Sequence, residues 1–218
     1  MDPAPRTRTP SQGRAVRTRA ALVAAAAQEF AASGYAATTA KRIAARAGAA
    51  TGSFYQYFTD KDALLRELAA SRQDALVEGA LAAIEAATPP GGAALSAIAG
   101  AVRAQLAVVV AAVVDYHAAD PGLHAVITER RHADPGLDAL ITAGERRLLA
   151  RITALLARWG HVGDPTATAF ILLATLEGAV HAHVLGHPVV DDTTFAAALA
   201  DALFRIALPA PKEHPWPS

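Results

Sequence analysis

The chain has 218 residues, 20 Lys and Arg against 20 Asp and Glu, and no net charge at neutral pH. With 53% hydrophobic and 18% charged residues, the composition excludes an intrinsically disordered protein and provides enough apolar surface for a substantial core. The absence of cysteine excludes disulfides, thiol catalysis and thiolate metal sites. No secretory signal pattern is visible, and the apolar run 106–114 is too short to span a bilayer, so we expect a cytoplasmic protein.

Helical patterns account for the N-terminal quarter of the chain. Residues 1–13 are rich in Pro, Thr and Arg and predict a disordered basic arm. A helix is expected from Arg14 to Ser33, ended by Gly34, because glycine adopts the left-handed conformation that follows a helix. We therefore expect the folded part of the chain to begin near residue 14.

Two short helices and a turn follow. Thr38 and Thr39 are expected to cap the first of them, and Gly48 is expected to end it. The next helix is predicted over 51–57, and Asp60 is expected to cap a long fourth helix. A helix, a glycine-containing turn and a second helix at this spacing are typical of a helix-turn-helix unit.

The remainder reads as helices separated by Asp-Pro and proline-rich breaks. The fourth helix should end near Thr88, before the sequence Pro-Pro-Gly-Gly at 89–92. A helix over 95–116 follows, and helix starts are expected where aspartate can cap a free helix end, at Asp120, Asp134, Asp164 and then Asp191 or Asp192. The last helix should end near 208, leaving a proline-rich tail over 209–218. The sequence therefore predicts an all-α protein.

Charge is distributed unevenly along the chain. Residues 1–61 hold nine Lys and Arg against three Asp and Glu, whereas residues 62–218 hold eleven against seventeen. A basic N-terminal region favours a polyanionic partner such as DNA, although a solvated basic tail and helix face would give the same asymmetry.

The region from Gly34 to Leu65 combines basic, hydroxyl and aromatic side chains at close spacing. The first residues of a helix that enters the major groove can present donors and acceptors to base edges, as can Gln56. Tyrosine hydroxyls and Lys61 are suited to phosphate oxygens, whereas Phe54 and Phe58 are expected to pack inward. The alternative is a three-helix unit that only packs.

These residues resemble the tetracycline-repressor (TetR) family of bacterial regulators over about residues 17–68. The match rests on the following residues: Phe30, Gly34, Tyr35, Thr38, Thr39, Ile43, Ala44, Ala47, Gly48, Gly52, Phe54, Tyr55, Tyr57, Phe58, Lys61 and Leu64. The resemblance implies an all-α homodimer of nine or ten helices. It also implies a three-helix DNA-binding domain over 14–60 and a helical regulatory and dimerisation domain over 61–208.

By the same resemblance, base-reading positions fall on Lys41, Thr51, Gly52, Ser53 and Gln56. Phosphate-contacting positions fall on Thr39, Tyr55, Tyr57 and Lys61. The sequence departs from the family at Ala49 and Ala50, where a branched apolar residue and serine are usual. Either the third helix lacks a side-chain cap and Thr51 is free to read bases, or Thr51 serves as the cap in place of that role.

The resemblance also implies that the last two long helices pair the two subunits. Ala174, Gly178 and Ala182 lie four residues apart and form a ridge of small residues that suits close helix approach. Leu199 and Leu203 lie on the apolar face of the last helix. The alternative is that these faces pack only within one protomer.

A ligand pocket is expected in the regulatory domain, with polar lining residues Arg103, Tyr116, His117, Glu177 and His181. Glu177 and His181 share one helix face at a spacing of four, as a ligand or metal anchor or as a mutually satisfied pair. His117, His124, His132, His183 and His187 are scattered along the sequence, so no metal site and no cofactor are predicted.

The sequence thus predicts a homodimeric repressor that binds a palindromic double-stranded operator and is released by a small apolar or amphipathic ligand. The alternative is a DNA-binding dimer without such a ligand, controlled by a protein partner or by its abundance. No serine elbow, phosphate loop or paired-carboxylate site stands out, so no enzyme activity and no membrane partner are expected.

Overall fold

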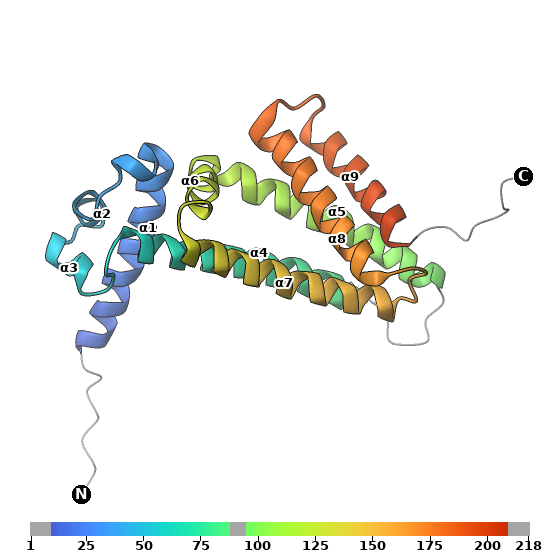
Figure 1. Ribbon diagram of the computed structural model, residues 1–218, viewed down its shortest axis with the longest axis horizontal. Coiled ribbons are helices and arrows are strands. Elements are labelled where there is room, and N and C mark those ends of the chain that lie inside the picture. The colour runs from blue at the N-terminus through green and yellow to red at the C-terminus, as the bar shows by residue number, and fades with distance from the viewer. Residues whose placement is uncertain (1–9, 88–94, 209–218) are drawn as a thin grey trace, which may run out of the picture. The chain divides into compact units, whose positions relative to one another are not determined.

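In the computed structural model the described residues are 10–87 and 95–208, and within them the chain is helical and contains no strand (Figure 1). The all-α prediction is confirmed. The basic arm at 1–9, the break at 89–92 and the tail at 209–218 lie outside the described residues. The elements are α1 Pro10–Ala37, α2 Ala40–Arg46, α3 Thr51–Tyr55, α4 Lys61–Ala87, α5 Leu95–Ala119, α6 Pro121–Arg131, α7 Pro135–Arg158, α8 Pro165–Val180, the π-helix η1 His181–Gly186 and α9 Asp192–Ala207.

Aspartate side chains cap four of the helices, as the sequence predicts. Asp60 accepts from the N–H of Ala63 at 2.7 Å, at the start of α4. Asp134 accepts from two backbone N–H groups in the first turn of α7, and Asp164 does the same in α8. At α9 the cap is Asp191, which accepts from the N–H of Thr194 at 2.9 Å. Each carboxylate satisfies N–H groups that have no partner inside the helix.

Three boundaries differ from the sequence-based expectation. Helix α1 begins at Pro10, so residues 10–13 are helical and do not belong to a disordered arm. Gly34 has φ 71° and breaks the regular helix, and the turn that follows still counts as part of α1. Helix α8 ends at Val180, where the chain widens into the π-helix η1.

The chain divides into two compact units. The first contains residues 1–70 and 122–138, so it joins α1 to α3 with the start of α4 and with α6. The sequence placed the end of this domain at residue 60 and did not include 122–138. Its core holds side chains from all of these helices: Leu22, Phe30, Ile43, Phe54, Phe58, Leu64, Leu65, Leu68, Leu123, Val126 and Leu137.

The second unit contains residues 71–121 and 139–218. One core cluster joins the valine-rich segment of α5 to α8 and α9 through Val110, Val180 and Leu203. A second cluster lies around Leu156 and Trp159 of α7 and includes Leu81 of α4. Burial of this apolar area is the main stabilising contribution to the unit.

Two helical segments of the second unit, 99–119 and 165–186, are long and apolar enough to cross a membrane by composition alone. The run 106–114, which is too short by itself, lies inside the first of them. Helix α5 packs against α8 and α9, and its valines Val109, Val110, Val113 and Val114 are buried among them. Helix α5 therefore contributes to the core of the second unit, and two such segments are weak evidence for a membrane protein.

Candidate nucleic-acid interface and regulatory region

Helices α2 and α3 are held on α1 by an apolar contact surface. Ile43 of α2 and Phe54 of α3 are fully buried, and Phe58, just after α3, is 5% exposed. The hydroxyl of Thr38 donates to the carbonyl of Glu29 or of Gly34, which fixes the entry to α2 on α1. Figure 1 shows α2 and α3 as two short helices joined by a turn beside α1. This is the helix-turn-helix arrangement that the sequence predicts.

Glu29 of α1 is a buried carboxylate that binds two arginines of α2. Arg46 donates to it at 2.6 Å and Arg42 at 2.8 Å. These hydrogen bonds hold the pKa of Glu29 below its usual value of 4.5, and the bond from Arg46 has the larger effect. Part of the positive charge of this region is therefore used to dock α2. The sequence analysis did not single out Glu29, although it is one of only three acidic residues among the first 61.

The proposed base-reading residues lie on the outer side of α2 and α3. Lys41, Thr51, Gly52 and Gln56 are exposed, and Ser53 is half-buried. Helix α3 begins at Thr51, and the cap position before it is held by Ala50, whose side chain makes no capping hydrogen bond. Thr51 is therefore a helical residue and does not serve as the cap. This resolves the alternative that the sequence left open and leaves Thr51 as a proposed base reader.

The proposed phosphate-contacting residues are not equivalent in the structure. Tyr55 is 60% exposed, and Tyr57 is half-buried. Thr39 is exposed and accepts from the N–H of Arg42 at 3.2 Å, which confirms it as the cap of α2. Because its own hydroxyl hydrogen is not used in that bond, Thr39 can still donate to a phosphate oxygen.

Lys61 is engaged inside the first unit. Its ammonium donates to the carbonyl of Tyr35 at 2.7 Å and to that of Thr38 at 2.9 Å. It also lies 3.9 Å from the centroid of the Tyr35 ring. Desolvation by burial lowers the pKa of Lys61. These contacts close the junction between α1, α2 and α4, and the phosphate-contacting role of Lys61 stays a prediction.

The same junction includes α6. Arg130 of α6 lies 4.0 Å from the Tyr35 ring centroid and donates to Asp62 of α4 at 3.3 Å. The hydroxyl of Tyr35 donates to the same carboxylate. Desolvation by burial is the main cause that raises the pKa of Tyr35 to about 12, and the hydrogen bond to Asp62 is the next largest. The phenol therefore stays protonated. The contact between Arg130 and Asp62 was not predicted, because nothing in the spacing relates residues 68 positions apart.

The predicted ligand-pocket residues fall into two groups within the second unit. Arg103 of α5 pairs with Asp201 of α9 and lies over the ring of Phe204. The guanidinium carbon of Arg72 lies over the ring of Tyr116, 4.8 Å from the centroid of that ring. These two residues thus make contacts with α9 and α4 and belong to the packing of the unit.

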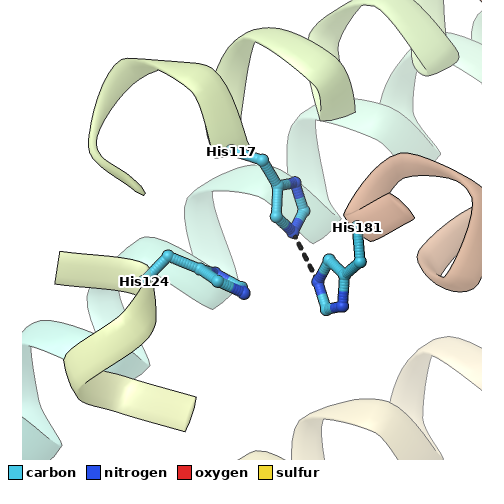
Figure 2. Close-up of side chains that lie close together, drawn as sticks. All are labelled: His117, His124 and His181. Atoms are coloured by element: carbon cyan, nitrogen blue, oxygen red, sulfur yellow. Dashed lines mark hydrogen bonds between the residues drawn. The ribbon is translucent and has the colours of Figure 1, made fainter. Parts of the chain in front are cut away.

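The other three predicted pocket residues come together. The Nε2 atoms of His117 and His181 lie 3.2 Å apart. Figure 2 marks this contact with a dashed line between the two rings. The Oε2 atom of Glu177 lies 3.4 Å from Nε2 of His181 and 3.9 Å from Nε2 of His117. The pairing of Glu177 with His181 agrees with their spacing of four residues, and His117, predicted for the same pocket, lies beside them. His117 is 3% exposed, whereas both partners are partly exposed.

The predicted dimer residues also divide. Ala174, Gly178 and Ala182 are exposed on the protomer, and Phe170 on the same ridge is 64% exposed. In contrast, Leu199 and Leu203 are 7% and 3% exposed in the core cluster with α5. Their side chains pack within the protomer and leave little surface open to a partner subunit, and their part in a subunit interface stays a prediction.

The two parts of the chain match the models of known protein domains. Residues 22–68 match the family model of the bacterial regulatory proteins of the tetR family. Residues 102–206 match the model of the tetracyclin repressor-like C-terminal domain. No curated protein matches the chain in sequence.

Solved structures share the fold. A protein of Mesorhizobium loti MAFF303099, assigned to the TetR family of transcriptional regulators, is 20% identical with a TM-score of 0.73, over 89% of this chain and 96% of the other. The fatty acid degradation regulator FadR of Bacillus halodurans is 24% identical with a TM-score of 0.68, over 86% and 94%. The regulator FadR of Bacillus subtilis in complex with stearoyl-CoA is 20% identical with a TM-score of 0.65, over 87% and 97%.

Proposed function

Because the chain belongs to the tetR family of bacterial regulatory proteins, we propose that it is a homodimeric repressor that binds a palindromic operator and leaves it when a small ligand binds. The observation that carries the DNA-binding part is the surface of α2 and α3. Polar residues there point outward from a unit fixed by Glu29, Phe54 and Lys61. Residues that read base edges need such a rigid support, because contact geometry determines discrimination.

The dimer part is supported by the small-residue ridge of α8. A Cβ added at Gly178 would meet no atom within 4 Å, so the fold of the protomer does not require glycine there. An exposed ridge with Phe170 at one end and small residues along it suits a partner helix at short distance. Two units related by a two-fold axis would then read half-sites about one turn of DNA apart or a multiple of that.

The ligand part is supported by one structural neighbour, the Bacillus subtilis regulator, whose structure contains stearoyl-CoA. We propose an apolar or amphipathic ligand for this chain also, bound in the second unit. Helices α4 and α7 each contribute residues to both units, and α6 belongs to the first. A ligand that favours one packing of the second unit could therefore change the position of the DNA-binding unit. A coupling free energy of about 1–3 kcal/mol would lower operator affinity about 5–150-fold.

The experiment begins with selection of DNA fragments that bind the purified protein. Fluorescence anisotropy then compares the selected site with a scrambled one for the wild type, Gln56→Ala and Tyr57→Phe. Gln56→Ala should reduce the preference between the two sites, whereas Tyr57→Phe should weaken both equally. The reverse pattern would mean that the two roles are exchanged.

Dimerisation and release are tested separately. Gly178→Leu should turn a dimer into a folded monomer in light scattering, and an unchanged mass would contradict the proposed interface. Stearoyl-CoA serves as the first ligand probe on the protein–operator complex. Ligands that bind tightly but leave operator affinity unchanged would point to the alternative of control by a protein partner or by abundance.

A further inference from the structure

The contact of His117, Glu177 and His181 assembles two imidazoles and one carboxylate from distant parts of the sequence. His117 lies in the last turn of α5, Glu177 near the end of α8, and His181 is the first residue of η1. All three belong to the second unit. Figure 2 draws His117 and His181 of this set, together with His124 of the first unit. The sequence placed the three in one expected ligand pocket but predicted no metal site, and 64 residues separate the two histidines.

The distances fit the coordination sphere of a small metal ion. Two ligand atoms about 2.0–2.2 Å from a tetrahedral zinc ion lie about 3.3–3.6 Å from each other. The three separations here are 3.2, 3.4 and 3.9 Å. Movement of the partly exposed Glu177 side chain by a few tenths of an ångström would bring its oxygen into the same range. One ion could therefore contact all three atoms without a change in the backbone.

The buried histidine is oriented by a hydrogen bond on its other nitrogen. Nδ1 of His117 lies 2.8 Å from the carbonyl oxygen of Val113. Because a carbonyl only accepts, Nδ1 carries the hydrogen, and the lone pair lies on Nε2, which faces His181 and Glu177. Metal-binding histidines almost always have such a partner, since it fixes the ring and its tautomer.

His181 is also suited to coordinate a cation. The side chains of His181 and Glu177 are 41% and 51% exposed, so an ion can reach the group from solution. The widened π-helical turn begins at His181, and such turns frequently occur at functional sites.

From this geometry we propose that His117, Glu177 and His181 form a binding site for one divalent transition-metal ion. Imidazole nitrogen is preferred by Zn²⁺, Ni²⁺, Cu²⁺ and Fe²⁺, whereas Mg²⁺ and Ca²⁺ prefer oxygen ligands. Three protein ligands leave at least one coordination position for water or for an oxygen donor of another molecule. The metal-free alternative is a hydrogen bond between the two imidazoles with Glu177 beside it.

The site goes beyond the proposed function, and it is tested without DNA. Untagged full-length protein is treated with EDTA, dialysed and titrated with Zn²⁺ by calorimetry, and separately with Co²⁺ by visible absorption. The variants are Glu177→Gln and His181→Gln, with His187→Gln as the matched control, because His187 is an exposed histidine of the same unit. Circular dichroism confirms that each variant is folded.

The proposal predicts one Zn²⁺ per chain, and a dissociation constant at least about tenfold higher in Glu177→Gln and in His181→Gln. His187→Gln should bind as the wild type does. The Co²⁺ band should disappear in His181→Gln. Failure of the wild type to bind Zn²⁺, or equal binding by all three variants, would overturn the site. Operator affinity measured in EDTA is a separate result, so loss of the metal site would leave the DNA-binding proposal intact.

Discussion

Gly122 of α6 lies against the backbone of Ala31 in α1, and no side chain fits between them. A Cβ at Gly122 would lie 2.4 Å from the carbonyl oxygen of Ala31 and 3.1 Å from its Cα and carbonyl carbon. Together with the contacts of Arg130 to Asp62 and Tyr35, this close approach makes α6 part of the DNA-binding unit. Glycine is required there by space.

Gly122→Ala should therefore destabilise the protein by about 1–3 kcal/mol, because backbone atoms must move to admit the methyl group. Urea denaturation measures the change. The matched control is Gly79→Ala in α4, where an added Cβ meets nothing within 4 Å. This control should be stabilised by about 0.5–1 kcal/mol. If Gly122→Ala is as stable as the control, α6 does not dock on α1 as described.

Gly52→Ala tests whether DNA approaches α3 closely. A Cβ at Gly52 meets no atom within 4 Å, so the free protein should be at least as stable as the wild type. Operator affinity should fall about tenfold or more, about 1.4 kcal/mol, because the methyl group would occupy space next to the groove. Unchanged affinity in an anisotropy titration would place the DNA elsewhere.

The two lysines of the DNA-binding region should respond differently to neutralisation. Lys61→Met removes a charged donor from the carbonyls of Tyr35 and Thr38, and should cost about 1–3 kcal/mol of stability. Lys41 is exposed, so Lys41→Met should leave stability within about 0.5 kcal/mol and weaken operator binding. Denaturation and anisotropy measurements on both variants separate the two roles. A Lys61→Met variant that is stable but binds DNA weakly would support the predicted phosphate contact of Lys61.

Glu29 predicts an acid-sensitive contact between α1 and α2. Its pKa is lowered from 4.5 in the folded protein, so its stabilising contribution is fully present above about pH 4.5. The contribution is lost as the pH falls below this value through the lowered folded pKa. Glu29→Gln should be less stable than the wild type at pH 7 and should lose less stability on acidification. Parallel slopes of unfolding free energy against pH for the two proteins would refute the assignment.

Local features could be predicted from the sequence, and long-range contacts could not. Aspartate caps such as Asp164 and the turn at Gly48 depend on neighbouring residues, and the structure has them where expected. Periodicity places Leu203 on the apolar face of its helix, but it does not show whether that face packs in the core of the protomer or against a partner subunit. Likewise, the carbonyls that bind Lys61 and the approach of His181 to His117 depend on how helices pack.

The central claim is that the protein binds DNA as a dimer, through exposed residues of α2 and α3 that contact phosphates and bases. The salt dependence of operator binding tests this claim most directly. Anisotropy titrations of a selected operator and of a scrambled duplex are compared between about 50 and 200 mM salt. If the dimer makes about 6–10 phosphate contacts, affinity should fall about 10³–10⁵-fold over this range, with the operator preferred throughout. An affinity nearly independent of salt, or equal for the two duplexes, would contradict the claim.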